Sequence, residues 1–242
     1  MKKIFASGSC RLLAALRDGR GVLESIHSLN YNFVGPNFLG KFHNTKQHIQ
    51  FIDWIHERVE IPEEWLKHIF TQVNETLLPH APRNNQEWRK TRKVIRNNFS
   101  DCDFYMFEIC STKIYEVNNI QMQNELWPKR PSYEQSESQI IDDLEHLVNI
   151  LPENAKVLFQ CHFRPNIYED NPDLAIANRE VIYTALKNFS HNNPNIFLWD
   201  PSQLLKQDKT CFGGDQNHFS FEHGLEQNFN RLFDIIETVN TI

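Results

Sequence analysis

The sequence predicts an α/β fold in which a mostly parallel sheet lies between two layers of helices. From residue 103 onward, strand-like and helix-like segments alternate, which is typical of parallel strands joined by helical crossovers. A further strand–helix unit stands at the start of the chain. Hydrophobic residues make up 40% of the 242 residues and aromatic residues 12%, which is enough for a sizeable core. These three observations together predict a three-layer α/β/α domain.

Short apolar runs bounded by polar residues mark the predicted strands. The first is KKIFAS (2–7), and the strongest is DFYMFEIC (103–110). A weaker run, IYEVNNIQ (114–121), suits an edge strand. Two more strands are predicted from AKVLFQCHF (155–163) and NIFLWD (195–200), and they complete the alternation with the helices.

Apolar residues at three- and four-residue steps mark the predicted helices. In 45–59, Ile49, Ile52 and Ile55 recur at these steps, and Thr45 is a suitable cap. The predicted helices are 9–21, 45–59, 62–78, 84–99, 132–151, 174–190, 201–207 and 221–239.

The length of the chain suits one domain that spans residues 1–242. Its segment 31–45 is predicted to be a loop because it is rich in Gly, Pro and Asn. The region 40–100 is rich in predicted helices and interrupts the alternation. We therefore expect this region to be a helical insertion or cap within the single domain.

Charge and apolar run length argue against several classes of partner. The formal net charge of −6 argues against a dedicated nucleic-acid-binding protein. The locally basic stretch 83–98 suits either a solvated helix face or a patch for an anionic ligand. No apolar run approaches the ~20 residues of a membrane span. The first residues resemble a signal peptide, but Arg11 interrupts their short apolar run, so a soluble, cytoplasmic protein is expected.

Cysteine and histidine spacing predicts neither a disulfide framework nor a metal centre. The five cysteines are odd in number and include no Cys-x-x-Cys pair. No His-Glu-x-x-His motif occurs. His43 and His48 stand five residues apart, as do His218 and His223, so neither pair has the four-residue helical step. We therefore expect no bound metal.

The first predicted strand ends in Gly8-Ser9-Cys10, directly before a predicted helix. The backbone N–H groups and positive dipole end of a helix N-terminus favour a thiolate or a developing oxyanion. Gly8 permits a sharp turn and the close approach of a substrate. Alternatively, Ser9 is only an N-cap and Cys10 only a small buried residue.

Near the other end of the chain, Gly213 and Gly214 lead into Asp215-x-x-His218, just before the last predicted helix. A histidine that acts as a general base needs a carboxylate to fix its tautomer. An Asp three residues earlier on the same turn can supply it. The alternative is a polar loop that caps the helix.

Other polar residues follow the predicted strands, at the edge where open α/β sheets bind ligands. Ser111 follows the strand 103–110, and His162 and Arg164 stand at the end of 155–163. His162 and Arg164 suit an anionic group such as a phosphate or the carboxylate of an acidic sugar. An ordinary polar loop is the alternative.

Taken together, the two terminal motifs resemble those of the SGNH/GDSL hydrolase superfamily. Its members have a nucleophile in a Gly-Asp-Ser turn after the first strand and an Asp-x-x-His before the last helix. Two branches with a Cys in the first motif are the most similar. Gly8-Ser9-Cys10 matches the GSCFA family, named for Gly-Ser-Cys-Phe-Ala, although Arg11 and Leu12 depart from it. The capsule polysaccharide-biosynthesis acetyltransferases have Gly-Asn-Cys-Gln, whose Gly and Cys match. The resemblance implies a flavodoxin-like SGNH fold.

The resemblance also implies roles for individual residues. Placing the first motif on Gly-Asp-Ser puts Cys10 at the nucleophile position, with Ser9 as the alternative nucleophile. If Cys10 is the nucleophile, Ser9 contributes its backbone N–H or hydroxyl to the oxyanion hole. GKFHNT (40–45) resembles the Gly-x-x-x-Asn segment of GSCFA proteins, which adds Gly40 and Asn44 as oxyanion candidates.

The expected function is acyl-ester chemistry on a carbohydrate. Cys10 or Ser9 attacks an acyl carbonyl, His218 accepts the proton, and Asp215 holds the imidazole. The capsule branch favours an O-acetyltransferase of polysaccharide biosynthesis, with acetyl-CoA as donor and a carbohydrate or nucleotide-sugar as substrate. The alternatives are an SGNH-type esterase that deacetylates glycans, a glycan-binding domain without catalysis, and a cysteine peptidase with the same dyad.

Overall fold

The protein's structure is a computed structural model. It describes residues 2–9, 11–12, 31–34, 42–70, 82, 84–123, 132–164, 174–211, 213, 219–220 and 223–240.

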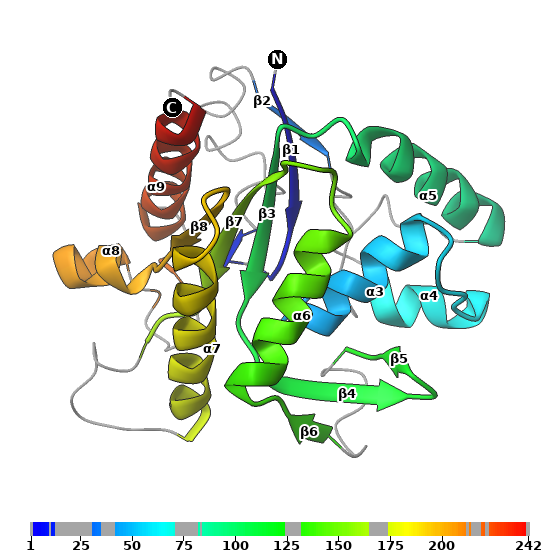
Figure 1. Ribbon diagram of the computed structural model, residues 1–242, viewed down its shortest axis with the longest axis horizontal. Helices are drawn as coiled ribbons and strands as arrows, with labels where there is room; N and C mark the ends of the chain where they lie inside the picture. The colour runs from blue at the N-terminus through cyan, green and yellow to red at the C-terminus, as the bar shows by residue number, and fades with distance from the viewer. Residues whose placement is uncertain are drawn as a thin grey trace.

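A five-stranded parallel sheet forms the centre of the molecule (Figure 1). Its strands, in spatial order, are β2 (Tyr31–Val34), β1 (Lys2–Ser7), β3 (Phe104–Ile109), β7 (Lys156–Cys161) and β8 (Ile196–Trp199). This order runs outward from β1 in both directions, as in flavodoxin-like folds. The direction changes between β1 and β3, which makes that gap the topological switch point where ligands bind in this fold class.

Helices cover one face of the sheet with aromatic side chains. Phe5 on β1 and Tyr105 on β3 point into this layer, where they pack with Phe51 and Phe99. Five helices contribute side chains to the same hydrophobic cluster as Phe5 and Tyr105. They are α3 (Thr45–Ile55), α4 (Glu63–Phe70), α5 (Asn85–Phe99), α6 (Glu137–Asn149) and α7 (Leu174–His191). The region 40–100 therefore supplies three helices to this layer.

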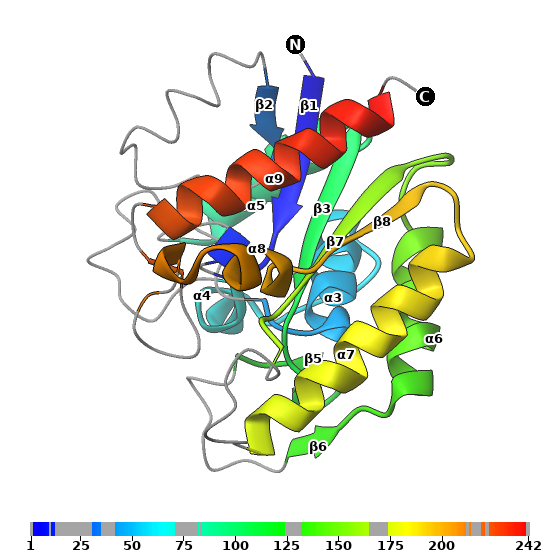
Figure 2. The ribbon, with the colours of Figure 1, turned by 90° about the vertical axis from the view of Figure 1, so that its left-hand side faces the viewer.

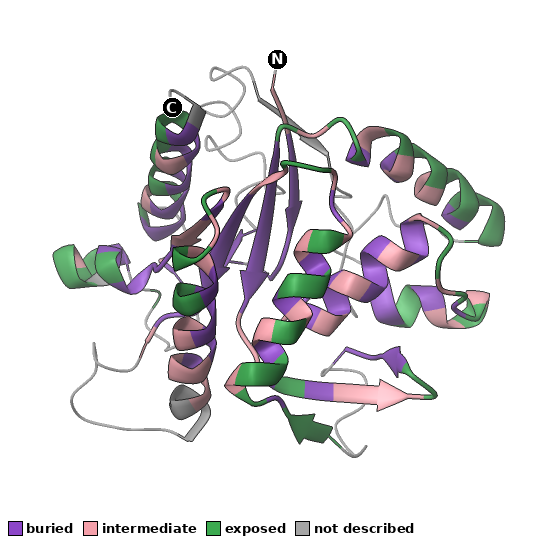
Figure 3. Ribbon diagram, in the orientation of Figure 1, coloured by how far each residue is buried: buried purple, intermediate pink, exposed green. Residues whose placement is uncertain are grey.

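The opposite face is covered by α9 (His223–Asn240), with α8 (Ser202–Gln207) and the 3-10 turn η3 (Lys209–Cys211) beside it (Figure 2). The alternate strand residues, such as Ile4 and Met106, pack against Leu232 and Phe229 of α9. The sheet is therefore buried on both faces, as the purple strands of Figure 3 show.

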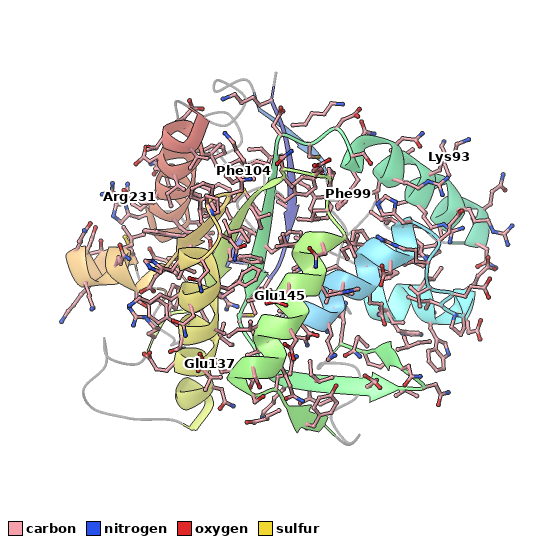
Figure 4. The ribbon with its side chains drawn as sticks, in the orientation of Figure 1. Lys93, Phe99, Phe104, Glu137, Glu145 and Arg231 are labelled. Atoms are coloured by element: carbon pink, nitrogen blue, oxygen red, sulfur yellow. The ribbon has the colours of Figure 1, made fainter. Side chains whose placement is uncertain are left out.

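Charged side chains lie on the outer surfaces of both helical layers. Figure 4 shows Lys93 on α5, Glu145 on α6 and Arg231 on α9, and all three are exposed. Phe99 and Phe104 in the same figure lie inside the layers, each with at most 1% of its surface exposed. Among the described helices, none is both long and apolar enough to cross a membrane.

A small antiparallel sheet extends below the main one. Its strands are β4 (Lys113–Val117), β5 (Ile120–Gln121) and β6 (Ser132–Glu134). Asn118 and Asn119 join β4 to β5 with φ of 53° and 62°. Two successive left-handed residues form the tight hairpin turn whose twist matches its strands. The run predicted as one edge strand at 114–121 is therefore a hairpin.

The predicted three-layer α/β class is confirmed, and so are the strands near 2–7, 103–110, 155–163 and 195–200. Of the helix predicted at 9–21, the structure describes residues 11–12, which are helical.

Three further local predictions were wrong. Residues 31–34 are not loop but β2, because they pair in register with β1, and four residues are too short a run for a pattern to show. Residues 132–134 form β6 instead of helix, and α6 begins after the capping box of Ser136. The cap of α3 is Asn44, whose side chain accepts from the Gln47 N–H, and not Thr45.

Candidate active site

The loops after β1, β3 and β7 meet at the carboxyl edge of the sheet, around the switch point. The loop after β1 begins with Gly8 and Ser9, directly beside the end of β3. A Cβ on Gly8 would lie 2.6 Å from the Cβ of Glu108. Glycine is therefore needed here so that the two strand ends can approach each other.

A buried carboxylate on β3 holds the turn after β1. The backbone N–H and the hydroxyl of Ser9 both donate to Oε2 of Glu108, at 2.8 and 2.6 Å. The guanidinium of Arg11 donates through Nε to Oε1 of the same side chain. Glu108 is fully buried and Arg11 is 6% exposed. The carboxylate therefore fixes the residues on both sides of position 10 by charge-assisted hydrogen bonds.

Ser9, which was predicted to take part in an oxyanion hole, has internal partners. Both of its donors are used by Glu108, and the residue is 1% exposed. The Arg11 N–H also points at the Ser9 hydroxyl oxygen, at 3.4 Å, as at a helix cap. Ser9 thus anchors the turn, and its part in an oxyanion hole stays a prediction.

A buried histidine braces the same strand ends from α3. His48 Nε2 lies 3.0 Å from the backbone carbonyl of Glu108, and Nδ1 lies 3.0 Å from the Ser7 hydroxyl. Because a carbonyl only accepts, Nε2 carries the proton and Nδ1 accepts from Ser7. Burial lowers the pKa of His48 to about 4, so the ring is neutral near pH 7.

The segment before α3 is tied to the end of β3. The carbonyl of His43 accepts from the N–H groups of Cys110 and Ser111, both at 2.8 Å. Asn44 is buried, and its amide donates to the Lys113 carbonyl at 3.0 Å while its oxygen caps α3. The Ser111 hydroxyl accepts from the Lys113 N–H. Asn44 and Ser111 therefore lie at the expected edge, with internal partners, and their substrate contacts stay predictions.

His162, directly after β7, carries a buried ring nitrogen that could meet a polar group of a ligand. It is 5% exposed, and its Nδ1 has no hydrogen-bond partner among the described residues. Burial, with the nearby charges of Arg11 and Arg179, holds its pKa well below its usual range. A neutral imidazole with an unused nitrogen is suited to a hydroxyl or other polar group of a substrate.

Arg164 has a carboxylate partner within the protein. Its Nε and Nη2 both donate to Oδ2 of Asp200, which is 1% exposed at the end of β8. Its guanidinium also lies 3.7 Å from the ring centre of Tyr183. Arg164 therefore has internal partners, and its contact with an anionic substrate group stays a prediction.

Four predicted residues lie outside the described part of the chain: Cys10, Gly40, Asp215 and His218. The described residues beside the two terminal motifs share one hydrophobic cluster. Leu12, from the first, and Phe219, from the second, both belong to it. The Phe219 ring contacts Phe163, whose neighbour is His162, at 4.7 Å between ring centres. The two ends of the chain thus converge on this edge of the sheet.

The residues that hold the site together, Glu108, His48 and Ser7, were missed in the sequence. Glu108 did carry a sign: it is the lone charged residue in the apolar strand FYMFEI. A charged residue in a buried strand is expected to be paired, and so to mark a site or a structural ion pair. Ser7 and His48 stand 41 residues apart, and nothing in the sequence joins them.

Comparisons with solved structures show the fold. The crystal structure of a carbohydrate esterase family 3 protein from Talaromyces cellulolyticus superposes over 100% of both chains, with a TM-score of 0.51 and 9% identity. A member of the lipolytic G-D-S-L family from Veillonella parvula DSM 2008 covers 93% of this chain and 94% of its own, with a TM-score of 0.42 and 11% identity. No curated protein has a significantly similar sequence.

The family assignment comes from the sequence match. The model of the TviD N-terminal domain family matches residues 2–129, which is more than half of the chain. The matched region runs from β1 through β5 and includes the Gly8 turn, Glu108 and His48. The protein, whose predicted SGNH-type fold is confirmed, therefore belongs to the TviD N-terminal domain family.

Proposed function

We propose that the protein is an O-acetyltransferase that acts on a carbohydrate, with Cys10 as its nucleophile. The observation that carries this proposal is the buried Glu108 clamp. Its hydrogen bonds hold Ser9 and Arg11, on either side of Cys10, at the switch point of the sheet. A nucleophile needs such a rigid support, because small displacements of the attacking atom slow the reaction strongly.

The environment of Ser9 supports Cys10 over Ser9 as the nucleophile. The Ser9 hydroxyl donates to a carboxylate at 2.6 Å and is almost fully buried. Attack by Ser9 would require breaking this charge-assisted bond inside the protein. A thiol at the start of a helix is favoured as the thiolate by the helix end.

The proposed reaction has two acyl transfers. In the first, His218 takes the thiol proton, Cys10 attacks the acetyl carbonyl of acetyl-CoA, and the CoA thiolate leaves and takes up that proton. In the second, a sugar hydroxyl gives its proton to His218 and attacks the thioester. The acetyl group moves to the sugar oxygen, and the proton returns to the Cys10 sulfur. Asp215 orients His218 in both steps.

An esterase that deacetylates glycans is the second candidate. It uses the same residues with water in place of the sugar hydroxyl. The structural neighbour from Talaromyces cellulolyticus is described as a carbohydrate esterase, which favours this candidate. In both cases His162 is proposed to meet the carbohydrate, since its buried Nδ1 is without a described partner.

Trapping the acetyl-enzyme tests the proposal. Intact-mass measurement after brief incubation with acetyl-CoA should show one added acetyl group, located at Cys10 by peptide mapping. Cys10→Ala should abolish this adduct, and His218→Ala should slow it. Absence of the adduct from the wild type, or its persistence in Cys10→Ala, would contradict the proposal.

Most of the other described cysteines are expected to react slowly with acetyl-CoA, because their thiols are buried or have raised pKa values. Burial raises the pKa of Cys102 to about 12 and that of Cys161 well above its usual range. Cys161 and Cys211 are fully buried. Cys110 is half-buried near the site, so Cys110→Ala is the matched control and should be acetylated like the wild type.

The fate of the acetyl group separates the two candidates. An acetyltransferase should turn over acetyl-CoA much faster with a glycan acceptor present and should give an acetylated sugar. An esterase should release acetate from an acetylated glycan without any acceptor. Transfer to neither water nor sugar, with binding of glycan retained, would instead favour a glycan-binding domain.

A further inference from the structure

Three metal-ligating side chains gather between η3 and the start of α9, outside the site described above. They are Asp208, Cys211 and His223. One ligand atom from each lies within 4.8 Å of the others. His223 Nε2 and Asp208 Oδ2 are 2.8 Å apart. Cys211 is fully buried, whereas the side chains of Asp208 and His223 are 39% and 46% exposed.

The Asp208 carboxylate is already oriented for coordination. Its Oδ1 accepts from the backbone N–H of Thr210 at 2.9 Å and from the Thr210 hydroxyl at 2.6 Å. These bonds leave Oδ2 to face His223 Nε2. Hydrogen bonds that fix a ligating carboxylate in this way are typical of protein metal sites.

We propose that Asp208, Cys211 and His223 form a zinc site. A thiolate, an imidazole and a carboxylate together suit Zn²⁺, which binds sulfur, nitrogen and oxygen donors with tetrahedral geometry. Ca²⁺ and Mg²⁺ prefer sets made of oxygen alone. Three protein ligands leave the fourth position to water on the exposed side of the cluster.

Coordination requires the thiolate form of Cys211. Burial and the neighbouring Asp208 raise the pKa of its thiol to about 11, so the metal-free sulfur keeps its proton. Zinc binding forms the Zn–S bond and releases this proton to solvent. Asp208 gives up no proton, since hydrogen bonds from Thr210 and His223 lower its pKa to about 2.

The ligands lie on both sides of the segment that carries Asp215 and His218. Two precede it and one follows it in the sequence, and the Cys211 carbonyl accepts from the Ser220 N–H at 2.8 Å across its base. A Cβ on Gly224 would lie 2.0 Å from the same carbonyl, so α9 packs directly on η3. A metal bound here would hold η3 and the start of α9 together.

Metal binding to the full-length protein tests the site. Dialysis against Zn²⁺ should load one equivalent, and Co²⁺ should give the charge-transfer absorption of a cobalt–thiolate bond. His223→Gln and Asp208→Asn should each weaken binding at least about tenfold. His68→Gln, which changes an exposed histidine on α4, should bind like the wild type.

Two outcomes would overturn the zinc site: a wild type that binds neither ion with thiolate ligation, or a His223→Gln variant that binds both like the wild type. Cys211→Ser should remove the charge-transfer band, but this residue is buried and the variant can fail to fold. The variants at the two partly exposed ligands keep the test decisive. Because the readout is binding, the test is independent of the acetyl transfer proposed above.

Discussion

Two clusters of polar side chains in this molecule lie in opposite surroundings. At the first, Glu108, Arg11 and Ser9 form a buried network in which every carboxylate oxygen has a partner. At the second, Asp208 and His223 are partly exposed and only Cys211 is buried. The difference teaches what each cluster is suited to do. A saturated buried network fixes a backbone, whereas an open cluster with convergent donors is suited to bind.

Removing the buried carboxylate should have the largest effect. Glu108→Gln leaves Arg11 without its carboxylate inside the protein and should lower the free energy of unfolding by about 4 kcal/mol. Urea denaturation measures it. The double variant Glu108→Gln/Arg11→Met should be less destabilised than the sum of the single changes. Strict additivity would show that the two side chains are not coupled.

Acid should lower the free energy of unfolding through His48, which contacts the backbone carbonyl of Glu108. Its pKa is about 4 in the folded protein and 6.5 when unfolded, so the unfolded chain binds more protons between these values. The contribution of His48 is complete above pH 6.5 and falls by about 3 kcal/mol as the pH drops to 4. His162 acts in the same direction. The variant His48→Gln should flatten the dependence of unfolding free energy on pH, and an unchanged slope would contradict this assignment.

Adding a Cβ between the ends of β1 and β3 should give the next largest loss of stability. Gly8→Ala places a Cβ against that of Glu108 and should cost about 2 kcal/mol, because two backbones must move apart. Thermal unfolding followed by circular dichroism measures this change. Acetylation of Cys10 should fall together with stability, since the same turn supports both. A variant as stable as the wild type would show that the close approach is not required.

The exposed cluster should give the smallest effect in the absence of metal. His223→Gln removes an exposed contact between His223 and Asp208, and such surface contacts contribute little to stability. With a chelator present, its midpoint of unfolding should match that of the wild type. With zinc added, only the wild type should become more stable. A large loss of stability in His223→Gln with the chelator present would show that this cluster stabilises the fold as the buried cluster does.

Sequence reasoning succeeded where a pattern is local. The strand DFYMFEIC and the helix periodicity near Ile49 and Ile52 predicted β3 and α3 within a few residues. It failed for β2, whose pairing with β1 is set by a neighbour 29 residues away. The expectation of no metal rested on the spacing of cysteines and histidines along the chain, which does not show the cluster in which His223 lies beside Asp208 and Cys211.

By itself, the sequence determined the α/β class, the order of the main elements and the two terminal motifs, because these depend on residue spacing along the chain. Only the tertiary structure decided which side chains are partners. In the folded protein, Glu108 accepts from Ser9 and pairs with Arg11, and Asp200 pairs with Arg164. These partners are far apart in the sequence, and they meet because a buried carboxylate must be paired. The residues with internal partners, such as Glu108, hold the site in place, whereas the proposed chemistry is assigned to Cys10 and His218.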